Sequence, residues 1–233
     1  MLHLLSGGAA KGLVTQLQAR FLERTGLQVQ GSFNAVGMMK EQLLSGTPCD
    51  VAILTDALIG QLTASGHVAA GSARPVGVVK TGMAVKQGAN VPPLATAAEL
   101  RQALRSAGAV YFPDPVKATA GIHFMNVLRQ LNLDTDIADR LRPCANGAAA
   151  MEALSTAAED AAIGCTQVTE IIFAQGVTLA ANLPKEFELA TVYTAAVCSR
   201  STQAQAAADL VSLLTSEEAA GLRSAGGFER LQA

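Results

Sequence analysis

The stretch of sequence that decides the fold is LHLLSGGAAKG, residues 2–12. Its leucines form a short apolar run that predicts a buried strand, and the run ends at Ser6-Gly7-Gly8. Further on, apolar residues recur at helical spacing, at Leu13, Leu17 and Phe21. The small-residue turn therefore leaves backbone N–H groups at a helix N-terminus, which favours a negatively charged ligand. The alternative is an ordinary strand-to-helix connection in which small residues allow close packing.

Composition limits the classes of function. The chain has 233 residues, of which 50% are hydrophobic, enough for one large domain or two smaller lobes with cores of their own. The net charge of −2 and an aromatic content of 4% argue against a surface for nucleic acid. No stretch reaches the roughly 18 apolar residues that a membrane span needs, so no membrane insertion is expected.

The N-terminus and the cysteines bear on the cellular compartment. No signal peptide is expected ahead of a strand that begins at Leu2, so the chain is cytoplasmic if Met1 is the true start. It is periplasmic if an export signal has been removed. The four cysteines lack metal-ligand spacing, which predicts free thiols and no metal site. A Cys144–Cys165 disulfide remains an alternative for an exported protein.

The first part of the chain alternates strands and helices. Residues 27–33 and 50–55 predict two more strands, each followed by a helix, and Asp56 is placed to cap the second of these helices. Strand–helix repeats of this kind predict a parallel sheet with right-handed crossovers. The carboxyl ends of such strands form the ligand-binding edge, which brings together 6–9, 33–36 and Thr55.

The second part of the chain repeats this pattern. A strand over 74–85 is expected to lead into a second lobe with a helix over 96–106, and residues 118–121 open another helix after a strand over 109–112. A further strand is expected over 161–164, with a helix starting at Thr166-Gln167. A long strand over 187–197 then returns to the first lobe, on which two terminal helices pack.

The predicted fold class is α/β, with two lobes that each combine a mixed sheet with flanking helices and a ligand cleft between them. The first lobe comprises residues 1–79 and 197–233, and the second comprises 80–196. Each lobe is expected to present a helix N-terminus to the cleft, as in a hinged receptor for a small anion. A single doubly wound domain is the competing interpretation.

Several segments together resemble a known family. They are Ser6–Gly12, Phe21–Gly26, Cys49–Leu54, Ala118–Phe124, Ala162–Ile171 and Thr191–Tyr193. Their order and spacing over nearly the whole chain resemble the type II periplasmic solute-binding proteins of ABC transporters, in the molybdate-binding-protein-like branch (extracellular solute-binding family 11). The resemblance implies a two-lobed fold, a periplasmic location, a small anionic ligand and an ABC permease as partner. We expect a monomer without cofactor.

The sequence departs from this family at the residues that hold molybdate. Alignment without gaps puts Ala9 where the family has its first oxyanion serine, and the second serine falls at Ala35-Val36. Tyr193 stands where the resemblance places the molybdate-binding tyrosine, and Ala120-Gly121 matches the helix start of the second lobe. A buried oxyanion loses about 1–3 kcal/mol for each missing donor, so an organic carboxylate is favoured over molybdate or tungstate.

Fifteen residues are predicted to contact the ligand, from the strand ends and helix starts of both lobes. They are Ser6, Gly7, Gly8, Ala9, Lys11, Asn34, Ala35, Thr55, Thr119, Ala120, Gly121, His123, Thr166, Gln167 and Tyr193. For Lys11 the alternative is a solvated lysine, and for His123 a structural histidine.

An enzyme on the same scaffold is the second hypothesis. The resemblance extends to isomerases of unsaturated tricarboxylates such as aconitate, in which a proton moves between carbons next to carboxylates. His123 would then carry the proton and Lys11 would stabilise the enolate-like charge. The chain contains no G-x-S-x-G, P-loop or H-E-x-x-H motif, so a non-catalytic receptor is favoured.

Overall fold

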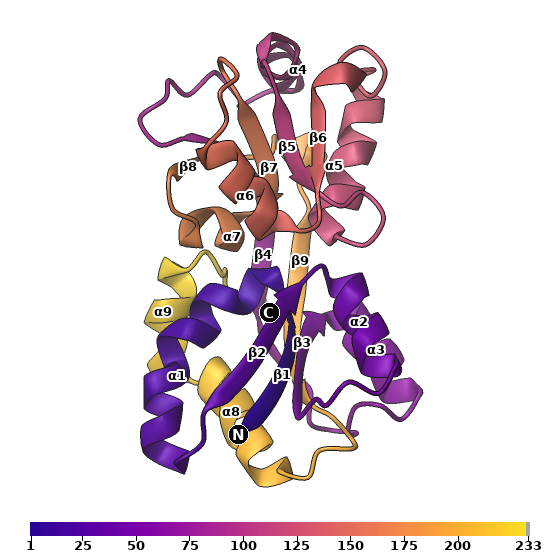
Figure 1. The fold of residues 1–233 in the computed structure, drawn as a ribbon, viewed down its shortest axis with the longest axis vertical. Helices are drawn as coiled ribbons and strands as arrows, with labels where there is room; N and C mark the ends of the chain where they lie inside the picture. The colour runs from indigo at the N-terminus through magenta and orange to yellow at the C-terminus, as the bar shows by residue number, and fades with distance from the viewer. Residues whose placement is uncertain (232–233) are drawn as a thin grey trace. The chain divides into compact units, whose positions relative to one another are not determined.

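The chain forms two compact units in the computed structural model, which describes residues 1–231 (Figure 1). Unit 1 comprises Met1–Val79 and the chain from Thr191 onward, and unit 2 comprises Lys80–Ala190. The first boundary coincides with the predicted one. The second lies six residues before the predicted boundary, because Tyr193–Val197 pair with the strand Val51–Thr55 of unit 1.

Unit 1 contains a mixed sheet with the strand order β2-β1-β3-β9. The strands β1, β2 and β3 are parallel, and β9 is antiparallel to β3. These strands are β1 (Leu2–Gly7), β2 (Val29–Asn34), β3 (Val51–Thr55) and β9 (Ala190–Val197). The helices are η1 (Gly8–Ala10), α1 (Lys11–Thr25), α2 (Val36–Leu44), α3 (Asp56–Ala64), α8 (Ala204–Thr215), η4 (Glu217–Ala219) and α9 (Ala220–Ala225).

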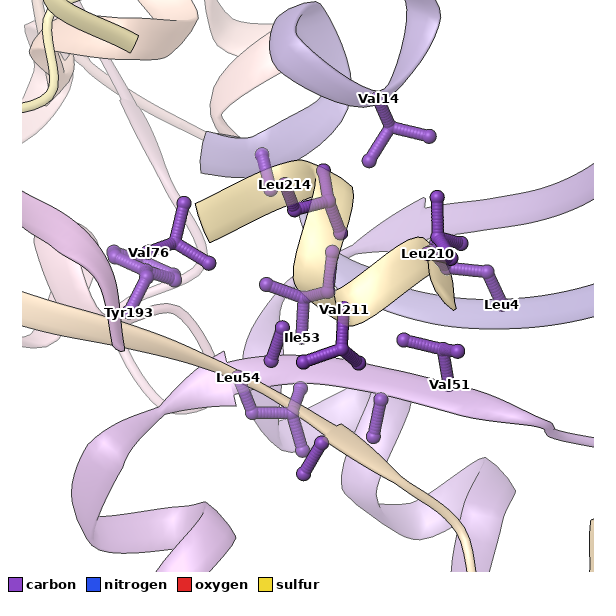
Figure 2. Packing of buried hydrophobic residues seen from close by; sticks show 14 of the residues in the cluster. Leu4, Val14, Val51, Ile53, Leu54, Val76, Tyr193, Leu210, Val211 and Leu214 are labelled. Atoms are coloured by element: carbon purple, nitrogen blue, oxygen red, sulfur yellow. The ribbon is translucent and has the colours of Figure 1, made fainter. Parts of the chain in front are cut away.

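The helices of unit 1 cover both faces of its sheet, with α1 and α8 on one side and α2 and α3 on the other (Figure 1). Figure 2 shows Leu210, Val211 and Leu214 of α8 packed toward the strand residues Leu4 and Ile53. Every residue of β3 except Thr55 is buried, as expected of a central strand covered on both faces.

Unit 2 contains three parallel strands, β5, β6 and β7, and two that run antiparallel to their partners, β4 and β8. The strands are β4 (Arg74–Lys86, in unit 2 from Lys80), β5 (Val110–Pro113), β6 (Leu141–Cys144), β7 (Ile163–Gln167) and β8 (Val177–Asn182). The helices are α4 (Ala97–Ser106), α5 (Thr119–Gln130), η2 (Ala138–Arg140), α6 (Gly147–Ser155), α7 (Val168–Phe173) and η3 (Lys185–Phe187).

Unit 2 has two hydrophobic clusters, one on each face of its sheet, and successive residues of a strand point into different clusters. Phe112 of β5 packs with α4 and α5 and stacks edge-on against Phe124, with ring centroids 5.5 Å apart. Tyr111, the preceding residue, packs instead with Met151 and Leu154 of α6. The helices α4 and α5 therefore cover one face of this sheet, and α6 and α7 cover the other.

Several strands differ from their predicted bounds by one to three residues, and two of these differences change the interpretation. The strand β7 continues to Gln167, so Thr166 and Gln167 end a strand where a helix start was predicted, because Gln167 pairs with Thr81 of β4. The returning strand begins at Ala190, because Lys185–Phe187 form a 3-10 turn.

The alternative of a Cys144–Cys165 disulfide is wrong. Cys165 is buried in the cluster around Phe112, whereas Cys144 packs against the cluster around Tyr111 on the other face of the sheet. All four cysteines are free thiols. Among residues 1–231 no helix is both long and apolar enough to cross a membrane, and no three His, Cys, Asp or Glu side chains group as a metal site would require.

Candidate functional site

The carboxyl ends of the parallel strands of unit 1 bring the predicted residues of this unit to one edge. Gly7 pairs with Asn34, and Thr55 pairs with Tyr193 of β9. Three helical segments begin at this edge, at Gly8, Val36 and Asp56, and none of the three starts has a side-chain cap. Their first N–H groups therefore present an electropositive edge to an anion.

Polar side chains at this edge bond within unit 1. The hydroxyl of the fully buried Ser6 donates to the carbonyl of Gly7 (2.8 Å), and the Asn34 side-chain oxygen accepts from the N–H of Ala35 (2.9 Å). Thr194 donates to Asp56 Oδ1 (2.8 Å) in the first turn of α3. These bonds shape the turns and engage the side chains inside the unit.

The turn at Gly7 is packed too closely for a larger residue. A Cβ on Gly7 would lie 2.7 Å from Val36 Cγ1 and 3.1 Å from the ring of Tyr193. Tyr193 is only 2% exposed and belongs to the hydrophobic core of unit 1 (Figure 2). The close approach explains the glycine and places the tyrosine ring against the turn.

The other predicted residues of unit 1 differ in exposure. Ala9 and Ala35 are buried, and Gly8 and Thr55 are partly buried. Lys11 is exposed on the first turn of α1, where the helix dipole disfavours a cation. The two alanines offer no hydroxyl, so the first turns of η1 and α2 contribute backbone N–H groups.

In unit 2 the turn after β5 holds the start of α5. The Asp114 carboxylate accepts from the N–H groups of Val116 (2.7 Å) and Lys117 (2.9 Å), and α5 begins at Thr119 without a side-chain cap. A Cβ on Gly121 would lie 2.2 Å from the carbonyl oxygen of Pro113. The first turn of α5, with the buried Ala120 and the partly buried Thr119, therefore rests directly on the end of β5.

Thr166 at the end of β7 bonds inside unit 2. Its hydroxyl donates to Glu170 Oε2 (2.5 Å), and a Cβ on Gly147 at the start of α6 would collide with that carboxylate. Burial raises the pKa of Glu170, although the bonds from Thr166 and from the Gln167 backbone act in the opposite direction. Thr166 is therefore a partner of Glu170.

Gln167 contrasts with Thr166. Gln167 is 3% exposed, yet neither its amide nitrogen nor its amide oxygen has a hydrogen-bond partner among the described residues. Its register partner Thr81 is 1% exposed, with a hydroxyl that is equally unpartnered. Paired residues of an antiparallel ladder share a face, here the face that α4 and α5 cover. Buried polar groups are rarely left unsatisfied, so these atoms are candidates for hydrogen bonds to a bound ligand.

Thr169, in the first turn of α7, has a second unpartnered and buried hydroxyl of unit 2. Neither Thr81 nor Thr169 was predicted from the sequence. The pairing of β4 with β7 joins residues about 80 positions apart, and no local pattern marks it.

His123 has a structural contact. Its Nε2 lies 2.7 Å from the carbonyl oxygen of Phe187, an acceptor, so Nε2 carries a proton and His123 fastens α5 to η3. Only Nδ1 remains for a ligand or for proton transfer.

A cavity of about 380 Å³ opens at the other end of β7. Its walls are mainly apolar and include Val85, Val91, Pro93, Ala103 and Ile163. Because Ile163 begins the strand that Gln167 ends, this cavity is separate from the predicted site, and none of the predicted site residues lines it.

The fold defines the class of protein: it is the two-lobed type II fold of periplasmic binding proteins. The chain belongs to the bacterial extracellular solute-binding protein family, whose sequence model matches residues 2–229. The resemblance stated from the sequence and the predicted fold class are thereby confirmed.

Individual relatives are more distant. The chain is 25% identical to an aconitate isomerase from Pseudomonas sp. over 225 residues, which cover 94% of this chain and 84% of the relative. The periplasmic molybdate-binding protein of Azotobacter vinelandii has a similar structure, with a TM-score of 0.83 at 20% identity over the full length of both chains. L-phospholactate-bound PEB3 from Campylobacter jejuni matches over both full chains with a TM-score of 0.70 at 13% identity.

Proposed function

We propose that this protein binds a small organic anion of the carboxylate type and delivers it to an ABC permease as an extracellular receptor. The observation that carries the proposal is the unpartnered amide of Gln167. An amide has N–H donors and a carbonyl acceptor, and both need partners once they are buried. A ligand that satisfies Gln167 must therefore bring a hydrogen-bond donor as well as an acceptor.

This requirement separates two classes of anion. A fully deprotonated oxyanion such as molybdate carries acceptors only, so it satisfies the amide nitrogen and leaves the oxygen unpaired. A hydroxy acid, or an acid with one protonated carboxyl group, satisfies both. The buried alanines at positions 9 and 35 support the same choice, because they supply no hydroxyl to an oxyanion.

The remaining contacts are proposed by residue type. We assign the carboxylate groups to the uncapped first turns of η1, α2 and α5, with Thr55 and Thr119 as hydroxyl donors. Proteins of this fold include a molybdate-binding protein and PEB3 with bound L-phospholactate. The fold therefore accommodates both kinds of anion, and the side chains at the site determine which one is bound.

The test is a panel of ligands measured by thermal shift and isothermal calorimetry. It includes citrate, malate and cis- and trans-aconitate, tricarballylate as a carboxylate without hydroxyl, and molybdate, tungstate and sulfate. A ligand at a hundred times its Kd stabilises the folded chain by about 2.7 kcal/mol, a readily measured shift in Tm. We expect a hydroxy acid to give the largest shift. Stabilisation by molybdate or tungstate alone would overturn the proposal.

An isomerase is the second candidate, and the similarity to an aconitate isomerase over 94% of the chain favours it. The reaction would need a group that removes a proton beside one carboxylate and returns it at another carbon. His123 Nδ1 is the candidate base and Lys11 the candidate cation. Proton NMR of cis- and trans-aconitate in deuterated buffer decides between the two functions. Isotope exchange or interconversion supports the enzyme, and binding without either supports the receptor.

A further inference from the structure

Two of the free cysteines lie in contact although they are 149 residues apart in the sequence. Cys49 precedes β3, and Cys198 follows β9. Their sulfur atoms are 3.2 Å apart, with the Cys198 thiol donating to Cys49 Sγ, and the Cys49 thiol in turn donates to the carbonyl of Val51 (3.2 Å).

The backbone around both thiols is fixed by hydrogen bonds. The N–H of Cys198 donates to the carbonyl of Asp50 (2.9 Å), which ties the two cysteine segments together. The Asp50 carboxylate, itself 5% exposed, accepts from the N–H of His3 (2.8 Å) and from the hydroxyl of Ser201 (2.6 Å). The two sulfurs are therefore held close by the folded framework of unit 1.

We propose that Cys49 and Cys198 form a disulfide bond in the mature protein. A disulfide needs its sulfurs at about 2.05 Å, so they must approach by about 1.2 Å, which side-chain rotation can supply in a fixed backbone. The family is extracellular, and disulfides form and persist in that kind of compartment.

The chemistry is thiol–disulfide exchange with an oxidant disulfide, such as that of a periplasmic thiol oxidase or oxidised glutathione. Cys49 is the more exposed of the two, and its thiolate attacks one oxidant sulfur while the other leaves as a thiolate. Cys198 then loses its proton and attacks Cys49 Sγ, which closes the bond and releases the second oxidant thiol. Two protein thiols are oxidised, and one oxidant disulfide is reduced to two thiols.

The bond would close a loop that contains the whole of Lys80–Ala190 and anchor both ends of that loop in unit 1. A loop of this length restricts the unfolded chain strongly, so the oxidised protein is expected to be more stable than the reduced one. Cys144 and Cys165 cannot compete, because they lie on opposite faces of the sheet in unit 2.

The test uses the full chain, fully reduced and then equilibrated with a mixture of reduced and oxidised glutathione. We expect the number of thiols titrated in guanidinium to fall from four to two, with an intact mass lower by about 2 Da. Peptide mapping should identify a disulfide-linked pair of peptides that contain Cys49 and Cys198, and the Tm should rise by roughly 5–10 °C.

The matched variants separate the two cysteine pairs. On oxidation, the double variant Cys144→Ser/Cys165→Ser should still lose two titratable thiols and show the same increase in Tm. The variant Cys49→Ser/Cys198→Ser should lose no titratable thiol. Because mapping is performed on the unmodified chain, the result does not depend on the folding of a variant. Four titratable thiols after equilibration, a bond to Cys144 or Cys165, or a disulfide between two chains would overturn the proposal.

Discussion

The two units differ in how many of their buried polar side chains have hydrogen-bond partners. At the strand ends of unit 1, Ser6, Asn34 and Thr194 all bond to groups of the same unit. In unit 2, by contrast, Gln167 and two threonines contribute four of the five buried side-chain atoms without partners among the described residues. Unit 1 therefore presents helix starts with uncapped backbone N–H groups, whereas unit 2 contains buried side chains whose polar atoms are available to a ligand.

Both units also place a glycine at a strand-to-helix turn, but the surroundings differ. A Cβ on Gly7 would meet side-chain atoms of Val36 and Tyr193, so accommodating it requires those buried side chains to repack. A Cβ on Gly121 would meet the backbone carbonyl oxygens of Pro113 and Asp114 at 2.2 and 2.3 Å, which cannot shift without moving α5 away from β5. The turn of unit 2 is therefore the less tolerant of the two.

The largest effect is expected for Gly121→Ala. Overpacking against backbone should cost about 2–4 kcal/mol, even though alanine favours a helix interior by about 1 kcal/mol over glycine. For a chain of 233 residues this corresponds to a fall in Tm of roughly 5–10 °C.

Gly7→Ala is the matched variant, with an expected loss of about 1–2 kcal/mol because its nearest neighbours are side chains, which can repack without moving the backbone. Thermal and urea unfolding of both variants measure the contrast. If Gly7→Ala were the more damaging of the two, the ranking of the two turns would be wrong.

The second effect concerns Gln167→Met, a change of similar volume that removes both polar atoms. Without ligand, the free energy of unfolding should rise by about 1–3 kcal/mol, because a buried amide without partners is destabilising. Affinity for the organic anion should fall by about 10–100-fold, since the proposed function assigns the same atoms to the ligand. Stability and affinity therefore move in opposite directions.

Two further variants make this result specific. Ser6→Ala should lower stability by about 1 kcal/mol, because its hydroxyl already bonds the Gly7 carbonyl. Gln18→Met, at an exposed glutamine of α1, should leave affinity unchanged. A Gln167→Met protein that binds as tightly as the parent would show that the amide is satisfied by water and does not contact the ligand.

The same contrast explains what the sequence could predict. Alternating strands and helices are local patterns, so the α/β class and the turns at Gly7 and Gly121 were predictable from spacing alone. The repeated pattern predicted two lobes, with a single doubly wound domain as the alternative. The family resemblance over six segments implied the two-lobed fold as well, and the family and structural matches confirm it.

Features that depend on long-range pairing were not predictable. Gln167 was predicted at a helix start, and its position opposite Thr81 follows only from the antiparallel ladder between β4 and β7. The contact between Cys49 and Cys198 likewise depends on β9 lying beside β3, and the sequence alone suggested only Cys144 and Cys165 as an alternative to free thiols. Local periodicity predicts whether a residue lies in a helix or a strand, but it does not predict which residue of a distant strand lies beside it.

A smaller effect is expected from the partly buried Glu170, whose carboxyl group accepts from Thr166. Its pKa is raised above the ordinary value of 4.5, chiefly by burial, so the folded state holds this proton more tightly than the unfolded state does. This contribution to stability is fully present below pH 4.5 and is lost as the pH rises through the folded-state pKa. Glu170→Gln should remove that decline, which urea unfolding of both proteins from pH 4 upward would measure. An identical pH dependence in the two proteins would contradict the assignment.

The smallest effect separates the two interpretations of Lys11, which is exposed on the first turn of α1. A cation there opposes the helix dipole, so Lys11→Gln should raise the free energy of unfolding by about 0.3–1 kcal/mol at low salt, and less at high salt. If Lys11 also contacts a carboxylate of the ligand, the same variant must bind more weakly, and the loss must shrink as salt increases. Urea unfolding and isothermal titration calorimetry, each at two ionic strengths, measure the change in stability and the change in affinity of the variant. A gain in stability without a loss of affinity would show that Lys11 is a solvated residue. Any anion contact of unit 1 would then come from its backbone N–H groups, whereas the candidate contacts of unit 2 include the side chain of Gln167.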